Sequence, residues 1–511
     1  MFNWNKRLFL ATLAPKKHLF PLFAFVIPLL VRFIPEILMS SYVVGFDTIG
    51  YYIPTTLSWL HGGVNLWSFL ATAPLFYTLT AGLTLVSGSL IWVLKVLPPV
   101  LLGFLGLAIY SYARRGLGWS PKKSLIPALL GTLYFVALRV SWDAFREEVA
   151  LIFFFVVLAL LVAKSEASNK FSWKRFTAFS LALVGVMLSN QFVAALMLGV
   201  VLFTVIYKLI RESRIDAARI VLFSLPAVLL FFAILYLSPA IPEYRLIFGF
   251  PATTDGWLAL FGYSSYQAML TSEAGFILYC FAPLLPLALL SVRRFKNFQM
   301  QSWIILILAV ALIPIVSPSD MRLLMLLTYP LVFYVTEGIS WLRLVNWKRF
   351  GVALLRVGMV YLVVMTAVLS LGFMLMPPSE PFPYYSSKAI NGYIYQIPSS
   401  MLQNTVALGD CKDTVNTLQW LKDNITENGI LLTHRTFYGW ALSSDFSSQQ
   451  LLLYEYDNPA DAAATATLKG YDQIYLIWWI NGQGWSGQPT VPASFHEVYQ
   501  SGKIAIYQYG V

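Results

Sequence analysis

Charge is what this sequence lacks most. Of its 511 residues 12% are charged and 58% are hydrophobic, whereas soluble domains carry roughly 25% charged residues. The mean hydropathy of +0.69 agrees with this imbalance. Most of the chain must lie where charge is costly, so the composition excludes a soluble globular enzyme and a disordered scaffold. It predicts an integral membrane protein.

Cysteine and histidine are also scarce. Cys280 and Cys411 offer no disulfide framework, and the four histidines form no HxxxH or Cys/His metal pattern. The sequence contains no GxGxxG, no phosphate-binding P-loop and no G-x-S-x-G. A nucleotide-driven pump and a serine hydrolase therefore lack support.

The basic residues are unevenly placed. The net charge is +11, and 22 of the 35 Lys and Arg residues fall in six clusters between apolar runs, near positions 6–17, 114–123, 164–175, 208–219, 293–296 and 343–349. Short cytoplasmic loops of membrane proteins are enriched in Lys and Arg. We expect all six clusters to be cytoplasmic, with membrane lipids as neighbours and no nucleic-acid partner.

Placing each cluster inside predicts about eleven transmembrane helices, with a cytoplasmic N-terminus. The predicted spans lie near 19–40, 91–112, 125–141, 149–163, 176–189, 192–208, 218–238, 274–292, 302–317, 321–341 and 351–376. The predicted fold is an all-α polytopic bundle over residues 1–376 in the cell membrane, followed by a small extracytoplasmic α/β domain over 377–511. The apolar segment 66–87 would reverse this orientation as a span, so we place it on the outer surface, within a first external loop from about Ser41 to Leu90. A hairpin pair over 66–112 is the alternative.

Soluble patterning follows four prolines at positions 377–383. Alternating helical and β-rich runs predict helices at 412–424 and 459–469, and strands at 429–433, 451–454, 473–478 and 504–509.

The first external loop contains Asp47, followed by Tyr51 and Tyr52. A carboxylate there can accept a proton from a hydroxyl group, and tyrosine rings can stack on a substrate. Alternatively, Asp47 is a solvated loop residue beside interfacial tyrosines. His61, in the same loop, is a further candidate, with a structural role as its alternative.

A second acidic segment lies between the third and fourth predicted spans, with Asp143, Arg146, Glu147 and Glu148. Such a group is costly between apolar helices unless it is paired or used. The carboxylates could hold Mg²⁺ or Mn²⁺, and Arg146 could bind phosphate. The alternative is a charged hairpin with an Arg146–Glu pair.

Arg322 begins a late helix that continues through Tyr329-Pro330. It could bind a lipid phosphate through two hydrogen bonds, or it could pair with Asp320 or reach the headgroups.

Together these motifs resemble the GT-C superfamily of membrane glycosyltransferases, which includes the protein mannosyltransferases and aminoarabinose transferases. The resemblance rests on Gly45-Phe46-Asp47 with Tyr51-Tyr52, on Trp142-Asp143 with Glu147, and on Arg322 through Pro330. It implies transfer of a sugar from a polyprenyl-phosphate donor to a hydroxyl group of a glycan, lipid or protein on the outer side, with inversion. Asp47 is then the general base, and Asp143 and Glu147 orient it. Tyr51, Tyr52, His61, Arg146 and Arg322 bind substrate, and no cofactor is needed beyond a divalent cation that Asp47 and Asp143 could hold.

One departure concerns oligosaccharyltransferases, whose Trp-Trp-Asp-x-Gly signature is only superficially similar to Trp478-Trp479-Ile480-Asn481-Gly482. The Asp is missing, so we expect the tryptophans to pack within the domain. This argues against transfer of a whole oligosaccharide to asparagine.

Two other functions compete with this hypothesis. A multi-pass transporter or lipid flippase fits the helix number, but such proteins usually contain repeats and midplane polar residues. Here the acidic residues gather outside, and we place five ionisable residues within or near the spans: Arg32, Glu36, Lys95, Glu337 and Arg356. A non-enzymatic anchor or receptor would leave the acidic outer loops unexplained.

Overall fold

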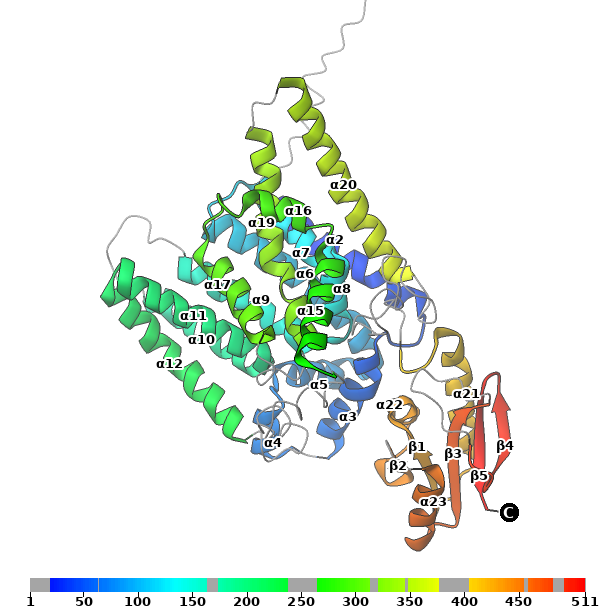
Figure 1. Ribbon diagram of the computed structural model, residues 1–511. Coiled ribbons are helices and arrows are strands. Elements are labelled where there is room, and N and C mark those ends of the chain that lie inside the picture. The colour runs from blue at the N-terminus through cyan, green and yellow to red at the C-terminus, as the bar shows by residue number, and fades with distance from the viewer. Residues whose placement is uncertain are drawn as a thin grey trace, which may run out of the picture.

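The computed structural model describes residues 19–62, 64–162, 173–237, 264–312, 320–344, 348–375, 404–454, 458–480 and 491–510. Within them, a body of helices is followed by a C-terminal domain built on one sheet (Figure 1). The helices of the body are α2 (Leu19–Leu38), η1 (Thr48–Tyr52), α3 (Ile53–His61), α4 (Leu66–Ala71), α5 (Leu75–Ser87), α6 (Leu90–Ser111), η2 (Tyr112–Gly116), α7 (Pro121–Leu133), α8 (Phe135–Asp143), α9 (Phe145–Val162), α10 (Trp173–Ser189), α11 (Gln191–Arg211), α12 (Arg214–Leu237), α15 (Tyr266–Phe281), α16 (Leu285–Ser291), α17 (Phe298–Ala311), α18 (Asp320–Met325), α19 (Thr328–Leu344) and α20 (Lys348–Leu375).

The described residues contain six helices that are long and apolar enough to cross a membrane, and eight if two bent pairs each count as one span. The pairs are α7 with α8, bent by 58°, and α15 with α16, bent by 90°. The chain is therefore a multi-pass membrane protein.

The predicted number of eleven spans is not confirmed. Helices α9, α10 and α17 do form where spans were predicted. However, the first turn of α9 contains three charged residues after Phe145, and α10 and α17 have 17 and 14 residues. A crossing needs about 20 apolar residues.

Two glycines let α6 pack closely against α2. A Cβ at Gly106 would lie 2.2 Å from the carbonyl oxygen of Ala24, and one at Gly103 would lie 2.9 Å from that of Phe25. Small residues at such contacts let helix backbones approach each other in a membrane, where van der Waals packing replaces the hydrophobic effect.

The segment 66–87 forms two short helices, α4 and α5, and not one span. At about 1.5 Å per residue α5 covers roughly 20 Å, less than the ~30 Å of a hydrocarbon core. Gly88, with φ of 72°, ends α5, and the Ser89 side chain accepts a hydrogen bond from the Trp92 N–H to begin α6. Helices α3, α4 and α5 lie at the end of the body opposite the C-terminal end of α19 and the start of α20 (Figure 1). The segment is thus not one continuous span, and its place on the outer surface stays a prediction.

The C-terminal domain contains a five-stranded sheet in the order β2-β1-β3-β5-β4. Strand β1 pairs in parallel with β2 and β3, and β5 pairs antiparallel with β3 and β4. The elements are η4 (Leu408–Asp410), α21 (Cys411–Asn424), β1 (Gly429–Thr433), α22 (Arg435–Ser443), η5 (Ser448–Gln450), β2 (Leu451–Leu453), α23 (Pro459–Leu468), β3 (Gln473–Trp479), β4 (Phe495–Ser501) and β5 (Ile504–Tyr509).

The two helices and four strands predicted for this domain are confirmed. Sequence patterning missed α22 and the edge strand β4, whose exposed polar residues give no apolar run. Trp478 and Trp479 on β3 are 1% and 2% exposed, and the Trp479 indole N–H donates to Asp410 Oδ2 over 3.0 Å. Their predicted role in packing is confirmed.

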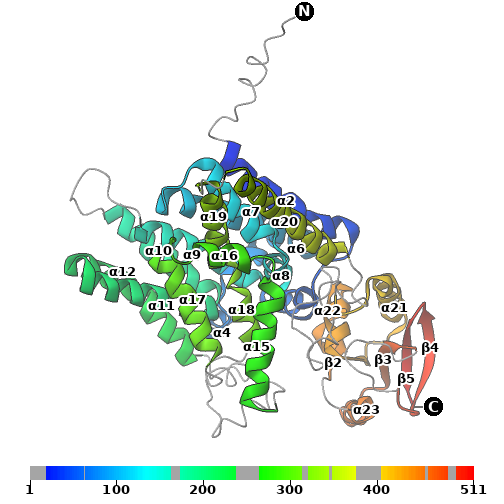
Figure 2. The same ribbon diagram turned by 45° about the horizontal axis from the view of Figure 1, so that its top comes forward.

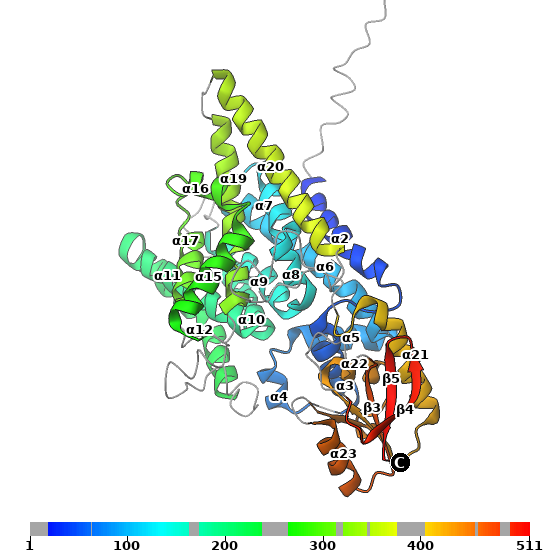
Figure 3. The same ribbon diagram turned by 45° about the vertical axis from the view of Figure 1, so that its right-hand side comes forward.

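Helix α22 lies on the side of this domain that faces the body. It contacts η1 and α3, and all three views show it between the sheet and the body (Figures 1, 2 and 3). The domain thus meets the segment that carries Asp47.

Candidate active site

The loop that carries Asp47 turns through a conformation that requires glycine. Gly45 has φ of 106°, a region that costs a side-chain-bearing residue steric strain. A Cβ at Gly45 would lie 2.6 Å from Asp143 Oδ1 and 2.7 Å from Thr48 Oγ1. The loop can therefore approach the end of α8 closely.

Asp143 is the buried last residue of α8, and it organises this loop. Its Oδ1 accepts a hydrogen bond from the Asp47 backbone N–H over 3.1 Å. Its Oδ2 lies 3.1 Å from Nη1 of Arg139, one helical turn earlier. Its carbonyl oxygen accepts a hydrogen bond of 2.8 Å from the Tyr52 hydroxyl. Asp143 thus fixes both the start and the end of the segment from Asp47 to Tyr52.

Arg322 on α18 faces two carboxylates. Its Nη2 lies 3.4 Å from Asp47 Oδ2, and its Nη1 lies 3.9 Å from Glu147 Oε1 on α9. The Arg322 side chain is 45% exposed, whereas those of Asp47 and Glu147 are 17% and 11% exposed. The guanidinium therefore contacts the carboxylates and still has an exposed side that a ligand can reach.

The surroundings of Asp47 make it a stronger base than a solvated carboxylate. Burial raises the pKa of Asp47, while the positive charges of Arg322 and Arg139 oppose that rise and Glu147 adds to it. A base is most effective when its pKa approaches the working pH. Burial also raises the pKa of Tyr52 well above its usual value, so this phenol stays neutral and donates its hydrogen bond to Asp143.

The two tyrosines of the loop have different surroundings. Tyr52 is buried, and its ring stacks on Phe145 with the ring centroids 4.9 Å apart. Tyr51 is 37% exposed. Tyr51 is thus better placed than Tyr52 to contact a substrate.

The other predicted site residues lie around this centre. Arg146 on α9 donates from Nη1 to the carbonyl oxygen of Thr72 over 2.8 Å, in the turn between α4 and α5. Glu148 is fully buried. His61 ends α3 at an exposed position, and within the described residues it makes no hydrogen bond or ion pair with Asp47, Asp143 or Arg322. The structure thus brings together Asp47, Asp143, Glu147 and Arg322, and leaves His61 apart from them.

A buried charge network of residues on α2 and α6 contacts the C-terminal end of α8. Arg32 and Glu36 on α2 form an ion pair of 2.7 Å, and Nζ of Lys95 on α6 lies 3.6 Å from the second Glu36 oxygen. Arg32 also donates from Nε to the carbonyl oxygen of Ser141 over 3.2 Å. Ser141 lies two residues before Asp143, so the network fixes the end of the helix that holds the loop.

Two residues of the site were missed at the sequence level. Arg139 lies within the predicted span 125–141 and should have been included among the ionisable residues of the spans. Its spacing of four residues from Asp143 on one helix could have revealed the pair. Asn404 contacts the Asp47 loop from 359 residues away, and no local signal marks it.

The carboxylates of the predicted cation site already have cationic neighbours. Asp47 lies beside Arg322 and Asp143 beside Arg139. Among the described residues, no group of three or more His, Cys, Asp or Glu side chains could hold a metal ion. A divalent cation at Asp47 and Asp143 stays a prediction that chelation can test.

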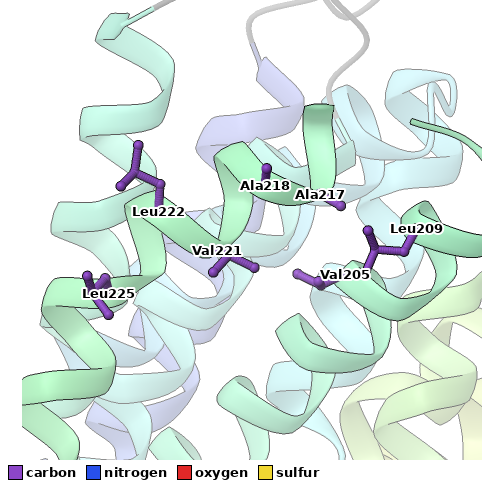
Figure 4. Close-up of a pocket in the computed structure, with 7 residues that line it drawn as sticks. All are labelled: Val205, Leu209, Ala217, Ala218, Val221, Leu222 and Leu225. Carbon is purple, nitrogen blue, oxygen red and sulfur yellow. The ribbon is translucent and has the colours of Figure 1, made fainter. Parts of the chain in front are cut away.

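A cavity of about 370 Å³ lies between α11 and α12, and aliphatic side chains line it (Figure 4). Its lining residues are Val205, Leu209, Ala217, Ala218, Val221, Leu222 and Leu225. Without a polar group, it offers no chemistry for a reaction.

Searches with the sequence find no matching family model and no curated protein. The structure matches several solved proteins. Arabinofuranosyltransferase AftD from mycobacteria aligns with 96% of this chain at 16% identity and a TM-score of 0.54. An Archaeoglobus fulgidus oligosaccharyltransferase aligns with 90% at 11% identity and 0.55, and ArnT from Cupriavidus metallidurans with 95% at 14% identity and 0.51.

These neighbours are glycosyltransferases of the GT-C type. The chain spans 40% of the length of AftD, 70% of the oligosaccharyltransferase and 97% of ArnT. At such low identity the likeness shows the fold: the chain has the fold of the GT-C glycosyltransferases. The resemblance predicted from the sequence is confirmed at that level.

Proposed function

We propose that this protein is a membrane glycosyltransferase that moves a sugar from a polyprenyl-phosphate donor to an acceptor hydroxyl group, with inversion. The GT-C fold supports the class. The observation that carries the proposal is the distance of 3.4 Å between Asp47 Oδ2 and Arg322 Nη2. It sets a partly buried base beside an accessible cation, and the reaction needs one group of each kind.

The base acts on the acceptor. Asp47 removes the proton of the acceptor hydroxyl as its oxygen forms a bond to the anomeric carbon. The bond from that carbon to the phosphate oxygen breaks, and its electron pair leaves with the polyprenyl phosphate. Because the acceptor oxygen attacks the face of the anomeric carbon opposite the leaving phosphate in a single displacement, the anomeric configuration is inverted.

The cation acts on the leaving group. Arg322 can donate two parallel hydrogen bonds to phosphate oxygens, and charge develops on these oxygens as the bond breaks. Arg146 is the second candidate for this role. Asp143 and Glu147 orient the base and the cation, and Tyr51 contributes a ring to the sugar.

The sidedness is part of the proposal. With the basic clusters in the cytoplasm, the site and the C-terminal domain lie outside, and the N-terminus lies inside. Residues 1–376 then form the catalytic unit and 377–511 an external unit. The acceptor is a glycan, a lipid or a protein hydroxyl.

The test is transfer of labelled sugar by purified protein in nanodiscs, from a panel of polyprenyl-phosphate sugars, with wild type beside Asp47→Asn. Asp461→Asn, at an exposed position of α23, is the matched control. We expect transfer by the wild type and the control, and its loss in Asp47→Asn.

Other results separate the parts of the proposal. Transfer by Asp47→Asn at the wild-type rate would keep the class and move the base, with Asp143 the next candidate. Failure of the folded wild type with every donor would overturn the enzyme assignment, and vesicle transport assays would then test the flippase alternative.

A further inference from the structure

The side chain of Asn404, in the C-terminal domain, forms hydrogen bonds with the backbone of the Asp47 loop. Its Oδ1 accepts a hydrogen bond of 2.7 Å from the Gly45 N–H, and its Nδ2 donates one of 2.9 Å to the carbonyl oxygen of Val43. Asn404 is 1% exposed. Its amide thus satisfies one donor and one acceptor of a loop backbone that pairs with no strand among the described residues.

A second contact joins the same two parts of the chain. A Cβ at Gly439 on α22 would lie 1.8 Å from the carbonyl oxygen of Ile49 in η1, so the two backbones touch. Beside it, the Trp440 ring packs edge to face on Tyr42 with the centroids 6.0 Å apart. The Trp440 indole N–H donates to Thr405 Oγ1 over 2.8 Å. Helix α22 is thereby tied to the segment that carries Asn404.

These contacts bracket the proposed base. Asp47 lies two residues after Gly45 and two before Ile49, and its own N–H is held by Asp143. The backbone around Asp47 is therefore held by the helical body through Asp143 and by the C-terminal domain through Asn404 and Gly439.

We propose that Asn404 is a positioning residue: through Gly45 and Val43 it locks the Asp47 loop, so that the C-terminal domain sets the place of the base opposite Arg322. Asn404 does not touch substrate in this scheme. The inference deepens the proposed function and rests on it for its catalytic consequence, whereas the locking of the loop can be measured without any reaction.

The first measurement is amide hydrogen exchange of the wild type over the loop. The Gly45 N–H, bonded to a buried amide, should exchange much more slowly than a solvated loop amide. In Asn404→Ala the same amide should exchange faster. Rapid exchange in the wild type, or equal exchange in the two proteins, would overturn the proposal.

The second measurement is the effect of Asn404→Ala on kcat and on KM, determined separately. A misplaced base lowers the rate of the chemical step, by about 100-fold for a displacement near 1 Å. We therefore expect a loss of that order in kcat for Asn404→Ala, with the KM for the donor little changed, since Arg322 and Arg146 are untouched. A rise in KM alone, or an unchanged kcat beside faster exchange, would contradict the positioning role.

A variant at another position guards against misfolding. Gly439→Ala keeps Asn404 but pushes α22 from η1, and should give the same signature in exchange and in kcat. Gly409→Ala is its control, because a Cβ at Gly409 meets nothing within 4 Å. If the wild type transfers no sugar, the proposed function fails by itself, and the exchange data still decide whether Asn404 locks the loop.

Discussion

The backbone N–H of Asp47 donates a hydrogen bond to Asp143 Oδ1 over 3.1 Å, although 96 residues separate the two in sequence. This bond uses the amide of Asp47 and leaves its carboxylate facing Arg322. The two acidic segments therefore have different tasks: Asp143, at the end of α8, holds the Asp47 loop by its backbone, and that loop carries the proposed base.

The close approach of the Asp47 loop to Asp143 at the end of α8 depends on Gly45, so Gly45→Ala should impair transfer. The added methyl group would lie 2.6 Å from Asp143 Oδ1, and the residue would have to keep a φ of 106°. We expect a fall in kcat of about 100-fold, since small misplacements of a catalytic group cost that much. Measured transfer rates check this. Gly50→Ala is the matched control, because its methyl group meets only Phe46, at 3.9 Å. Equal activity of the two variants would mean that the loop geometry does not limit the reaction.

The pH dependence of transfer should reveal Asp47 and its interaction with Arg322. A base acts only when it is deprotonated, so activity rises with pH through its pKa, and burial raises the pKa of Asp47 above the usual value. The positive charge of Arg322 opposes this rise. Removing it in Arg322→Gln should shift the acid limb to higher pH and lower kcat by about 100- to 1,000-fold, as loss of a transition-state donor does.

The control for this shift is Arg322→Lys, which keeps the charge but loses the planar fork that binds phosphate. Its acid limb should stay near that of the wild type while its kcat falls. Identical limbs in all three proteins would show that the titrating group is not Asp47.

Chelation should leave transfer intact. Arg322 and Arg139 already face Asp47 and Asp143, so the carboxylates do not require a cation to lie close together. We expect the same rate in EDTA as in added Mg²⁺ or Mn²⁺. Loss of activity in EDTA with recovery in Mn²⁺ would instead establish the divalent cation predicted at Asp47 and Asp143.

Hydropathy and soluble patterning were enough to predict the helical body and the C-terminal α/β domain, because burial acts over whole segments. The second acidic segment was expected as a connection between spans, whereas Asp143 ends α8 and Glu147 lies in the first turn of α9. The resemblance to the GT-C superfamily also implied that Asp47, Asp143 and Arg322 act at one site. The sequence could not define the breaks within spans, such as the bend of 58° between α7 and α8, since apolar composition continues across them.

Arg139 and Asn404 escaped prediction for different reasons. Arg139 lies within an apolar run. The free-energy cost of placing its charge there depends on whether it has an acidic partner, and only the helical register identifies Asp143 as that partner. Asn404 is a neutral side chain whose partners, Val43 and Gly45, are backbone groups. Any residue type could supply such groups, so only the folded structure connects them.

Breaking the ion pair between Arg139 and Asp143 should destabilise the protein. The two side chains are 13% and 3% exposed and lie 3.1 Å apart. Removing one partner of a buried pair leaves an uncompensated charge and typically costs about 3–5 kcal/mol. Arg139→Met should therefore lower the thermal midpoint of the detergent-solubilised protein markedly.

The double variant, Arg139→Met with Asp143→Asn, is the test of this explanation. It removes both charges and keeps an oxygen at position 143 that can accept from the Asp47 N–H. We expect it to regain much of the stability lost in Arg139→Met, which would appear as a coupling energy in a double-mutant cycle. Equal midpoints for the single and the double variant would show that packing around Arg139, and not the buried charge of Asp143, sets the loss.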